Sequence, residues 1–205
     1  MKKYIFIGCR LTALLFCFTI SKANAQEIPK DTALLIVDIQ YFYFPGGDAE
    51  LVDPEQASQN AAMILDYFRA YDQPIVHIRH NYEPGGEIHR SVKPKTGELV
   101  ISKDHANGFR DTDLFVHLTS NNIGTLVITG MQTHMCVEAT TRAAADYGFT
   151  CIVISDACAT RDLHYQERTI KAEDVHYSTL STLKDNYAKI MTTREFIELV
   201  SKNYN

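Results

Sequence analysis

The chain has 205 residues, of which 45% are hydrophobic and 22% are charged, and its formal net charge at pH 7 is −5. This length and composition predict a single globular domain with one proper hydrophobic core. The acidic balance argues against a nucleic-acid partner, because nucleic-acid-binding proteins present a basic face to the phosphates.

The first 25 residues have the order of features found in a secretory signal peptide. A basic start is followed by the apolar segment Leu11–Ile20 and by a small-residue ending at 23–25. The apolar segment is shorter than the roughly 20 residues that a membrane-spanning helix needs. We therefore expect cleavage before Gln26, leaving a domain over 26–205 that is periplasmic or secreted and has no stable membrane association.

Six short apolar runs predict β-strands, and their continuous rather than alternating pattern suits a sheet that is covered on both faces. The runs are Thr32–Ile39, Pro74–His80, Glu98–Ser102, Thr125–Gly130, Cys151–Ser155 and Ala188–Thr192. Amphipathic stretches between or after them predict helices over Asp53–Tyr71, His134–Tyr147, His164–Leu183 and from Thr192 onward. The alternation predicts an α/β fold with a doubly wound, six-stranded, mostly parallel sheet and helices on both faces, a Rossmann-like three-layer sandwich.

Two of these helices begin with capping signals. Asp53 is followed by Pro54 and Gln56, which predicts an N-cap, a proline at the first helical position and a capping-box glutamine. Thr192 and Glu195 have the same capping spacing at the start of the last helix.

Three chemically capable residues follow predicted strands. Asp38 follows the first strand, Lys103 the third and Cys136 the fourth. Ligands of doubly wound sheets bind outside the carboxyl ends of the strands, so these side chains are expected to meet there. Each residue could instead have a purely structural role. Asp38 would cap a turn, Lys103 would be a solvated loop lysine, and Cys136 would be a buried apolar residue.

Cys136 lies where a strand gives way to a helix. Unpaired N–H groups and the helix dipole favour a negative charge at that point, so we expect the pKa of the thiol to be lowered. Of the other cysteines that remain after the leader, Cys151 and Cys158 stand at either end of an apolar run. An extended run would hold them too far apart for a disulfide, so both are expected to be buried and unpaired.

Three segments carry a resemblance to a known superfamily. LLIVDIQ around Asp38, GELVISKDHANGF around Lys103 and LVITGMQTHMCVEATTRAAADYGF around Cys136 resemble the isochorismatase-like cysteine hydrolases, which include nicotinamidases and N-carbamoylsarcosine amidohydrolase. The similarity spans about Thr32 to Thr193. It implies that Asp38, Lys103 and Cys136 form a catalytic triad, that the Met131 to Gln132 peptide bond is cis, and that the protein is a homo-oligomer.

The resemblance leads to a mechanistic hypothesis, the hydrolysis of a small-molecule amide through a thioester. Asp38 would take the proton of Cys136, Lys103 would stabilise the resulting charges, and the sulfur would attack the carbonyl carbon. The backbone N–H groups of Gln132 and Cys136 would form the oxyanion hole. No cofactor is expected.

The substrate pocket is less well defined by the sequence. Four side chains are expected to line it: Tyr43, Phe44, His80 and Phe109. Nicotinamidases hold a metal with an Asp-x-His pair, which the matching segment HIRHNYEPGGEIH lacks. The spacing of its histidines fits no strong zinc signature, so no metal site is predicted from His77, His80 and His89.

Two other functions stay open. The segment from Cys136 to Arg142 satisfies Cys-x5-Arg, the tyrosine-phosphatase signature, although it contains no glycine and Glu138 would repel a phosphate. The second alternative is a non-catalytic binding or assembly protein with the same fold. An inert Cys136 or a closed crevice would indicate the latter.

Overall fold

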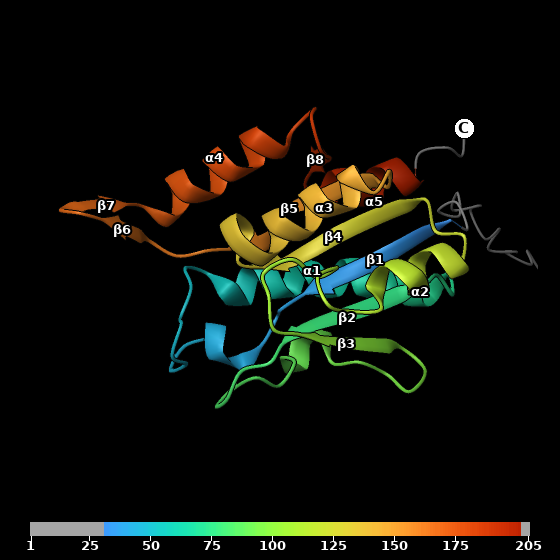
Figure 1. The fold of residues 1–205 in the computed structure, drawn as a ribbon, viewed down its shortest axis with the longest axis horizontal. Helices are drawn as coiled ribbons and strands as arrows, with labels where there is room; N and C mark the ends of the chain where they lie inside the picture. Colours follow the sequence, from blue (N-terminus) through green and yellow to red (C-terminus); the bar gives the residue numbers. More distant parts are fainter. Residues whose placement is uncertain (1–30, 202–205) are drawn as a thin grey trace, which may run out of the picture.

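The computed structural model describes residues 31–201, and the predicted leader lies outside them. Six strands form one parallel sheet in the order β3-β2-β1-β4-β5-β8 (Figure 1). The strands are β1 (Thr32–Val37), β2 (Ile75–His80), β3 (Leu99–Lys103), β4 (Thr125–Met131), β5 (Thr150–Ala159) and β8 (Lys189–Met191). The α-helices are α1 (Pro54–Ala70), α2 (Leu114–Ser120), α3 (Glu138–Asp146), α4 (Ala172–Leu183) and α5 (Thr193–Ser201). The predicted doubly wound α/β fold is confirmed.

Helices cover both faces of the sheet, and each face has its own hydrophobic core. Leu34 and Ile36 of β1 pack with residues of α1 and α5 in one core. Leu35 and Val37 point to the other face and pack with residues of α2, α3 and α4. Successive side chains of a strand alternate between faces, so a continuous apolar run supplies both cores at once. Within 31–201 no helix is long and apolar enough to cross a membrane.

The predicted helix over His164–Leu183 is wrong for its first eight residues, which lie before the start of α4 (Ala172–Leu183). The chain instead forms an antiparallel hairpin of β6 (Leu163–Tyr165) and β7 (Arg168–Ile170), and only then enters α4 (Figure 1). Gln166 in the connecting turn has a φ of 53°, a left-handed conformation that interrupts a right-handed helix. The short helix α2 between β3 and β4 was not predicted, because its seven residues give too few turns for a helical period to be seen.

The two capping predictions have different outcomes. Thr192 and Glu195 form the predicted box, with the Thr192 N–H donating to Glu195 Oε2 at 2.8 Å and the Glu195 N–H donating to Thr192 Oγ1 at 3.2 Å. Asp53 is the N-cap of α1, but its side chain makes no capping hydrogen bond and its φ is 50°. Gln56 donates instead to Asn60 Oδ1, at 3.3 Å. Pro54 at the first helical position is therefore the start signal that the structure retains.

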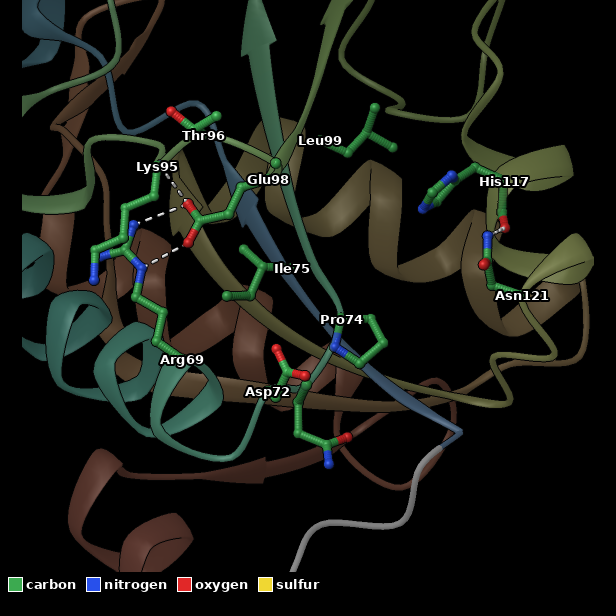
Figure 2. A pocket seen from close by; sticks show the side chains of 12 residues that line it. Arg69, Asp72, Pro74, Ile75, Lys95, Thr96, Glu98, Leu99, His117 and Asn121 are labelled. Atoms are coloured by element: carbon green, nitrogen blue, oxygen red, sulfur yellow. Dashed lines mark hydrogen bonds and ion pairs between the residues drawn. The ribbon is translucent and has the colours of Figure 1, made fainter.

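A cavity of about 580 Å³ lies at the amino ends of β2 and β3, the opposite edge of the sheet from Asp38 and Lys103. Figure 2 shows Glu98 at its wall beside Arg69. Glu98 accepts two hydrogen bonds from Arg69, at 2.7 and 2.9 Å, and lies 2.9 Å from Nε2 of the fully buried His77. Burial raises the pKa of Glu98, but these contacts and the N–H of Lys95 outweigh it and bring the pKa down to about 2.

Replacing Glu98 with Gln is expected to lower the free energy of unfolding at pH 7 by about 2 kcal/mol, because hydrogen bonds to charged groups contribute roughly 1.5 to 3 kcal/mol. A carboxyl whose pKa falls on folding stabilises the protein above its unfolded pKa, near 4.5, and loses that contribution as the pH falls toward about 2. Urea unfolding at pH 7 and pH 3 measures both effects. Asp66→Asn is the control, since Asp66 is 77% exposed and 3.9 Å from Arg69. An equal loss in both variants would contradict the prediction.

Candidate active site

Asp38 is the first residue after β1 and is fully buried. Its N–H donates to the carbonyl of Ile78 at 2.9 Å, which holds it against the end of β2. Its φ is 50°, in the left-handed region that aspartate and asparagine adopt more readily than most side chains. The first strand therefore ends in a turn with a carboxylate inside the protein.

Lys103 is the last residue of β3, and its side chain is fully buried. Its Nζ lies 2.6 Å from Asp38 Oδ2 and 3.4 Å from Cys136 Sγ. β2 lies between β1 and β3 in the sheet, so the lysine side chain extends past β2 to reach Asp38. The structure thus brings Asp38, Lys103 and Cys136 from three different parts of the sheet into one cluster, around a single ammonium group.

Cys136 lies in a π-helical turn, Thr133–Val137, that connects β4 to α3. The carbonyl of Gln132 accepts hydrogen bonds from the N–H groups of Met135, at 3.0 Å, and Val137, at 3.3 Å. The Met131 to Gln132 peptide bond is cis. The two hydrogen bonds to its carbonyl close the turn onto Gln132, so that Gln132 and Cys136 belong to one tight turn of backbone.

Gly130 allows this turn to start close to β1. Its φ is 139°, and a Cβ atom at this position would lie 2.0 Å from the carbonyl oxygen of Val37. Val37 is the residue before Asp38 and is paired with Gly130 in the sheet. Only glycine permits this approach of the backbone that leads to the cysteine toward the backbone that leads to the aspartate.

The expectation that the pKa of the Cys136 thiol is lowered is wrong. Burial and the charge of Asp38 raise it to about 12, and Lys103 opposes the rise without cancelling it. Burial also raises the pKa of Asp38, against the opposing effects of Lys103 and the thiol. The start of a helix does lie beside the cysteine, but desolvation is the larger effect. In the resting site the sulfur therefore keeps its proton, beside a carboxylate that has become more basic.

A cavity of about 230 Å³ opens onto Cys136. It is lined by Phe42, Tyr43, Ala49, His80, Tyr82, Ala106, Gln132, Met135, Cys136 and Arg161. Tyr43 and His80 are thus where the sequence placed them. Because the thiol lines an open cavity, the closed crevice that would indicate a non-catalytic protein is not found in residues 31–201.

Phe44 and Phe109 were wrongly expected in this pocket. Phe44 stacks on His89, with ring centroids 3.7 Å apart, and Phe109 packs in the core against Tyr147 and Phe149. The 3-10 helix Tyr41–Tyr43 changes which side chains face the cavity, so Phe42 lines it in place of Phe44.

Arg161 and the side chain of Gln132 were missed by the sequence analysis. Arg161 Nε donates to Gln132 Oε1 at 3.2 Å, and Gln132 Nε2 donates to the Tyr43 hydroxyl at 3.4 Å. β5 extends to Ala159, four residues beyond its predicted end, which puts Arg161 at the edge where β1 and β3 also end. Tyr43, Gln132 and Arg161 are therefore connected by hydrogen bonds along the wall of the cavity, where Arg161 supplies a positive charge.

The three histidines considered for a metal lie in different settings. His77 Nε2 contacts Glu98, His80 Nδ1 lies 3.4 Å from Lys103 Nζ, and His89 Nδ1 lies 2.8 Å from Ser91 Oγ. Among residues 31–201 no group of three His, Cys, Asp or Glu side chains is arranged to hold a metal ion.

The phosphatase interpretation is wrong. Arg142 is held by Glu138, with Nη2 to Oε1 at 2.8 Å, and its guanidinium lies over the ring of Tyr187 at 4.5 Å. Its guanidinium thus contacts Glu138 and Tyr187, and Cys136 to Arg142 form helical turns and not a loop around an anion. Cys151 and Cys158 are buried and unpaired, as predicted.

The chain matches known proteins over most of its length. Residues 32–195 match the model of the isochorismatase domain. The isochorismatase family protein YddQ of Bacillus subtilis is 42% identical over 82% of this chain and 99% of its own length. Maleamate amidohydrolase of Pseudomonas putida is 27% identical over 75% of this chain and 84% of its own. The crystal structure of an isochorismatase from Pseudomonas putida matches with a TM-score of 0.77 and 32% identity, covering 81% of this chain and 90% of the other. The chain belongs to the isochorismatase family of hydrolases.

Proposed function

We propose that this hydrolase cleaves a carbon–nitrogen bond of a small amide through a thioester on Cys136. The observation that carries the proposal is the single buried ammonium of Lys103, which contacts both Asp38 and Cys136. A buried ion pair is costly to desolvate, and the thiol beside it lies at the base of an open cavity. A nucleophile, a base and a group that stabilises negative charge are therefore together beside a cavity that can hold a small molecule.

The first half of the reaction forms the acyl-enzyme. Asp38 Oδ1 is buried and makes no hydrogen bond to a residue within 31–201, so it has a lone pair available for the thiol proton. The sulfur then bonds to the carbonyl carbon, and the oxyanion accepts hydrogen bonds from the N–H groups of Gln132 and Cys136. The carbon–nitrogen bond breaks as Asp38 returns its proton to the leaving nitrogen.

The second half releases the acid. Water attacks the thioester while Asp38 takes one of its protons, and the carbon–sulfur bond breaks to give the carboxylic acid and the thiol. The raised pKa of Asp38 suits both halves, because a carboxyl that holds a proton more tightly is a better base. No net oxidation or reduction occurs.

The acyl-enzyme provides the direct test. The protein is mixed with a panel of small primary and secondary amides, quenched in acid and digested, and the mass of the peptide containing Cys136 is measured. We expect an added mass equal to the acyl half of the substrate, together with release of the amine or ammonia. Hydrolysis without any acyl adduct under pre-steady-state conditions would contradict the thioester.

Arg161 is expected to favour amides that carry a negative charge away from the scissile bond. Arg161→Ala should raise KM about tenfold for an amide with a remote carboxylate, because a charged hydrogen bond contributes roughly 1.5 kcal/mol or more. The matching uncharged amide should show little change in KM. Arg161→Lys keeps the charge but loses the fork that reaches Gln132, and should give an intermediate KM. Equal losses for both substrates would exclude this role.

A further inference from the structure

The ammonium of Lys103 has a third neighbour besides Asp38 and Cys136. Nδ1 of His80, the last residue of β2, lies 3.4 Å from Nζ. An ammonium group has three N–H donors and no acceptor, so it can be fully satisfied by three acceptors. The three contacts of Lys103 are a carboxylate oxygen at 2.6 Å, a sulfur at 3.4 Å and an imidazole nitrogen at 3.4 Å.

This contact fixes the tautomer of His80. Lysine can only donate, so Nδ1 must carry a lone pair and the proton must be on Nε2. Burial and the charge of Lys103 both lower the pKa of His80, which agrees with a neutral ring. The other charged or titratable groups that act on it are Asp38 at the end of β1, and Asp104 and His105 in the loop after β3.

The backbone of His80 is held by a buried clamp. Gln40 Nε2 donates to the carbonyl of His80 at 2.8 Å, and the N–H of His80 donates to Gln40 Oε1 at 2.7 Å. Gln40 Nε2 also donates to the carbonyl of Gly86, at 2.6 Å. Gln40 is fully buried and lies two residues after Asp38, so the turn that carries the carboxylate also fixes the position of His80.

We infer that His80 has two functions in the proposed hydrolase reaction, one in positioning Lys103 and one in binding the substrate. Nδ1 anchors the ammonium of Lys103 between Asp38 and Cys136, and the N–H at Nε2 donates a hydrogen bond to the substrate. His80 lines the cavity, and no residue within 31–201 forms a hydrogen bond with Nε2. The inference rests on the proposed function and narrows its substrates to amides with a second acceptor, a carbonyl or carboxylate oxygen, near the scissile carbonyl.

Substitution of His80 by Asn or by Gln tests the functions of the two ring nitrogens separately. In His80→Asn the side-chain oxygen lies near the position of Nδ1, so the acceptor for Lys103 is kept and the donor to the substrate is lost. In His80→Gln the amide nitrogen lies near the position of Nε2, so the donor is kept and the anchor is lost. We expect Asn to raise KM about tenfold with kcat within about threefold, and Gln to lower kcat about tenfold with little change in KM.

Alkylation of Cys136 by iodoacetamide tests the anchor without a substrate. In His80→Gln the ammonium is free to move away from the sulfur, so alkylation at a fixed pH should slow by more than about threefold. His80→Asn should react like the unchanged protein. The alkylation rate can be measured even if no amide is hydrolysed. It therefore distinguishes failure of the proposed hydrolase function from failure of the proposed contact between His80 and Lys103. Equal alkylation rates in the two variants would overturn the anchor.

His164→Asn is the matched control, because His164 is exposed, contacts Thr169 Oγ1 at 3.1 Å and does not line the cavity. It should leave KM, kcat and the alkylation rate unchanged. Nitrogen NMR of the unchanged protein with labelled histidine needs no substitution at all. It should show His80 as the neutral tautomer protonated at Nε2, and a proton on Nδ1 would refute the inference.

Discussion

Replacing Cys136 with Ala is expected to reduce kcat/KM for amide hydrolysis by on the order of 10⁴ to 10⁶, as loss of the nucleophile does in other enzymes that form acyl intermediates. Asp38 and Lys103 remain in Cys136→Ala, but neither is placed to form a bond to the carbonyl carbon. Steady-state rates and intact-mass spectra, measured on the same samples, check the loss of turnover and of the acyl adduct together.

The other two thiols provide the control for this substitution. Cys151 and Cys158 are also buried, and burial raises the pKa of each to about 12. They differ from Cys136 in having no contact with Lys103. Cys151→Ala and Cys158→Ala should therefore keep activity within about threefold, while each loses a little stability to the cavity it creates. Full activity in Cys136→Ala would end the proposed mechanism.

Replacing Lys103 with Met should lower both activity and stability. Methionine fills a similar volume but leaves the carboxyl of Asp38 buried without its cation, and breaking a buried pair in this way costs about 3 to 5 kcal/mol. Both side chains are fully buried, so solvent does not screen the loss. kcat should fall by at least about a hundredfold, because the charge that stabilises the thiolate is gone. Urea unfolding and steady-state kinetics measure the two effects.

The loss of stability in Lys103→Met should depend on pH in a defined direction. Lys103 opposes the effect of burial on Asp38, so its removal raises the pKa of Asp38 further above 3.8. A carboxyl whose pKa is raised on folding supports the folded state at low pH and loses that support as the pH rises through the folded pKa. The variant should therefore be least stable relative to the unchanged protein at neutral pH, and the difference should shrink in acid.

Two further variants separate charge from packing. Asp38→Asn combined with Lys103→Met removes both charges and should recover stability without recovering activity. Lys171→Met breaks the exposed pair with Asp162, where Lys171 is 70% exposed, and should change stability by no measurable amount. If the double variant is as unstable as Lys103→Met, the loss of stability comes from the lost packing of the lysine side chain and not from the unpaired carboxylate of Asp38.

The sheet and the triad cluster could be predicted because they depend on the ends of apolar strands. Parallel strands end at one edge, so Asp38 and Lys103 could be expected at the same edge of the sheet. The strand order, which places only β2 between β1 and β3, was not predicted. The acidity of Cys136 could not be predicted, because it depends on how deeply the thiol is buried. The sequence showed the helix start, which lowers the pKa of the thiol, but it did not show the burial, which raises that pKa by more.

The walls of the pocket were harder to predict for a different reason. Tyr43 and Phe44 are adjacent in the sequence, and a turn whose type is set by distant contacts decides which of Phe42 and Phe44 faces the cavity. Arg161 was missed because the fifth apolar run was ended at Ser155, although β5 continues through Asp156 and Cys158 to Ala159. The hairpin before α4 likewise depends on one left-handed residue, Gln166, that no residue preference indicates.

The reactive groups and the walls around them belong to different parts of the fold. Asp38 and Lys103 lie at the ends of strands of the central sheet, which is covered by a hydrophobic core on each face. Phe42, Tyr82 and Arg161 come from connecting segments. Arg161 is exposed, so substitutions there can change the charge of the cavity at little cost to the core, whereas Phe42 and Tyr82 also pack in one of the cores. One such scaffold can therefore acquire new substrates over evolutionary time while the bond-breaking apparatus stays constant, and a search for its natural substrate should begin with the connecting segments.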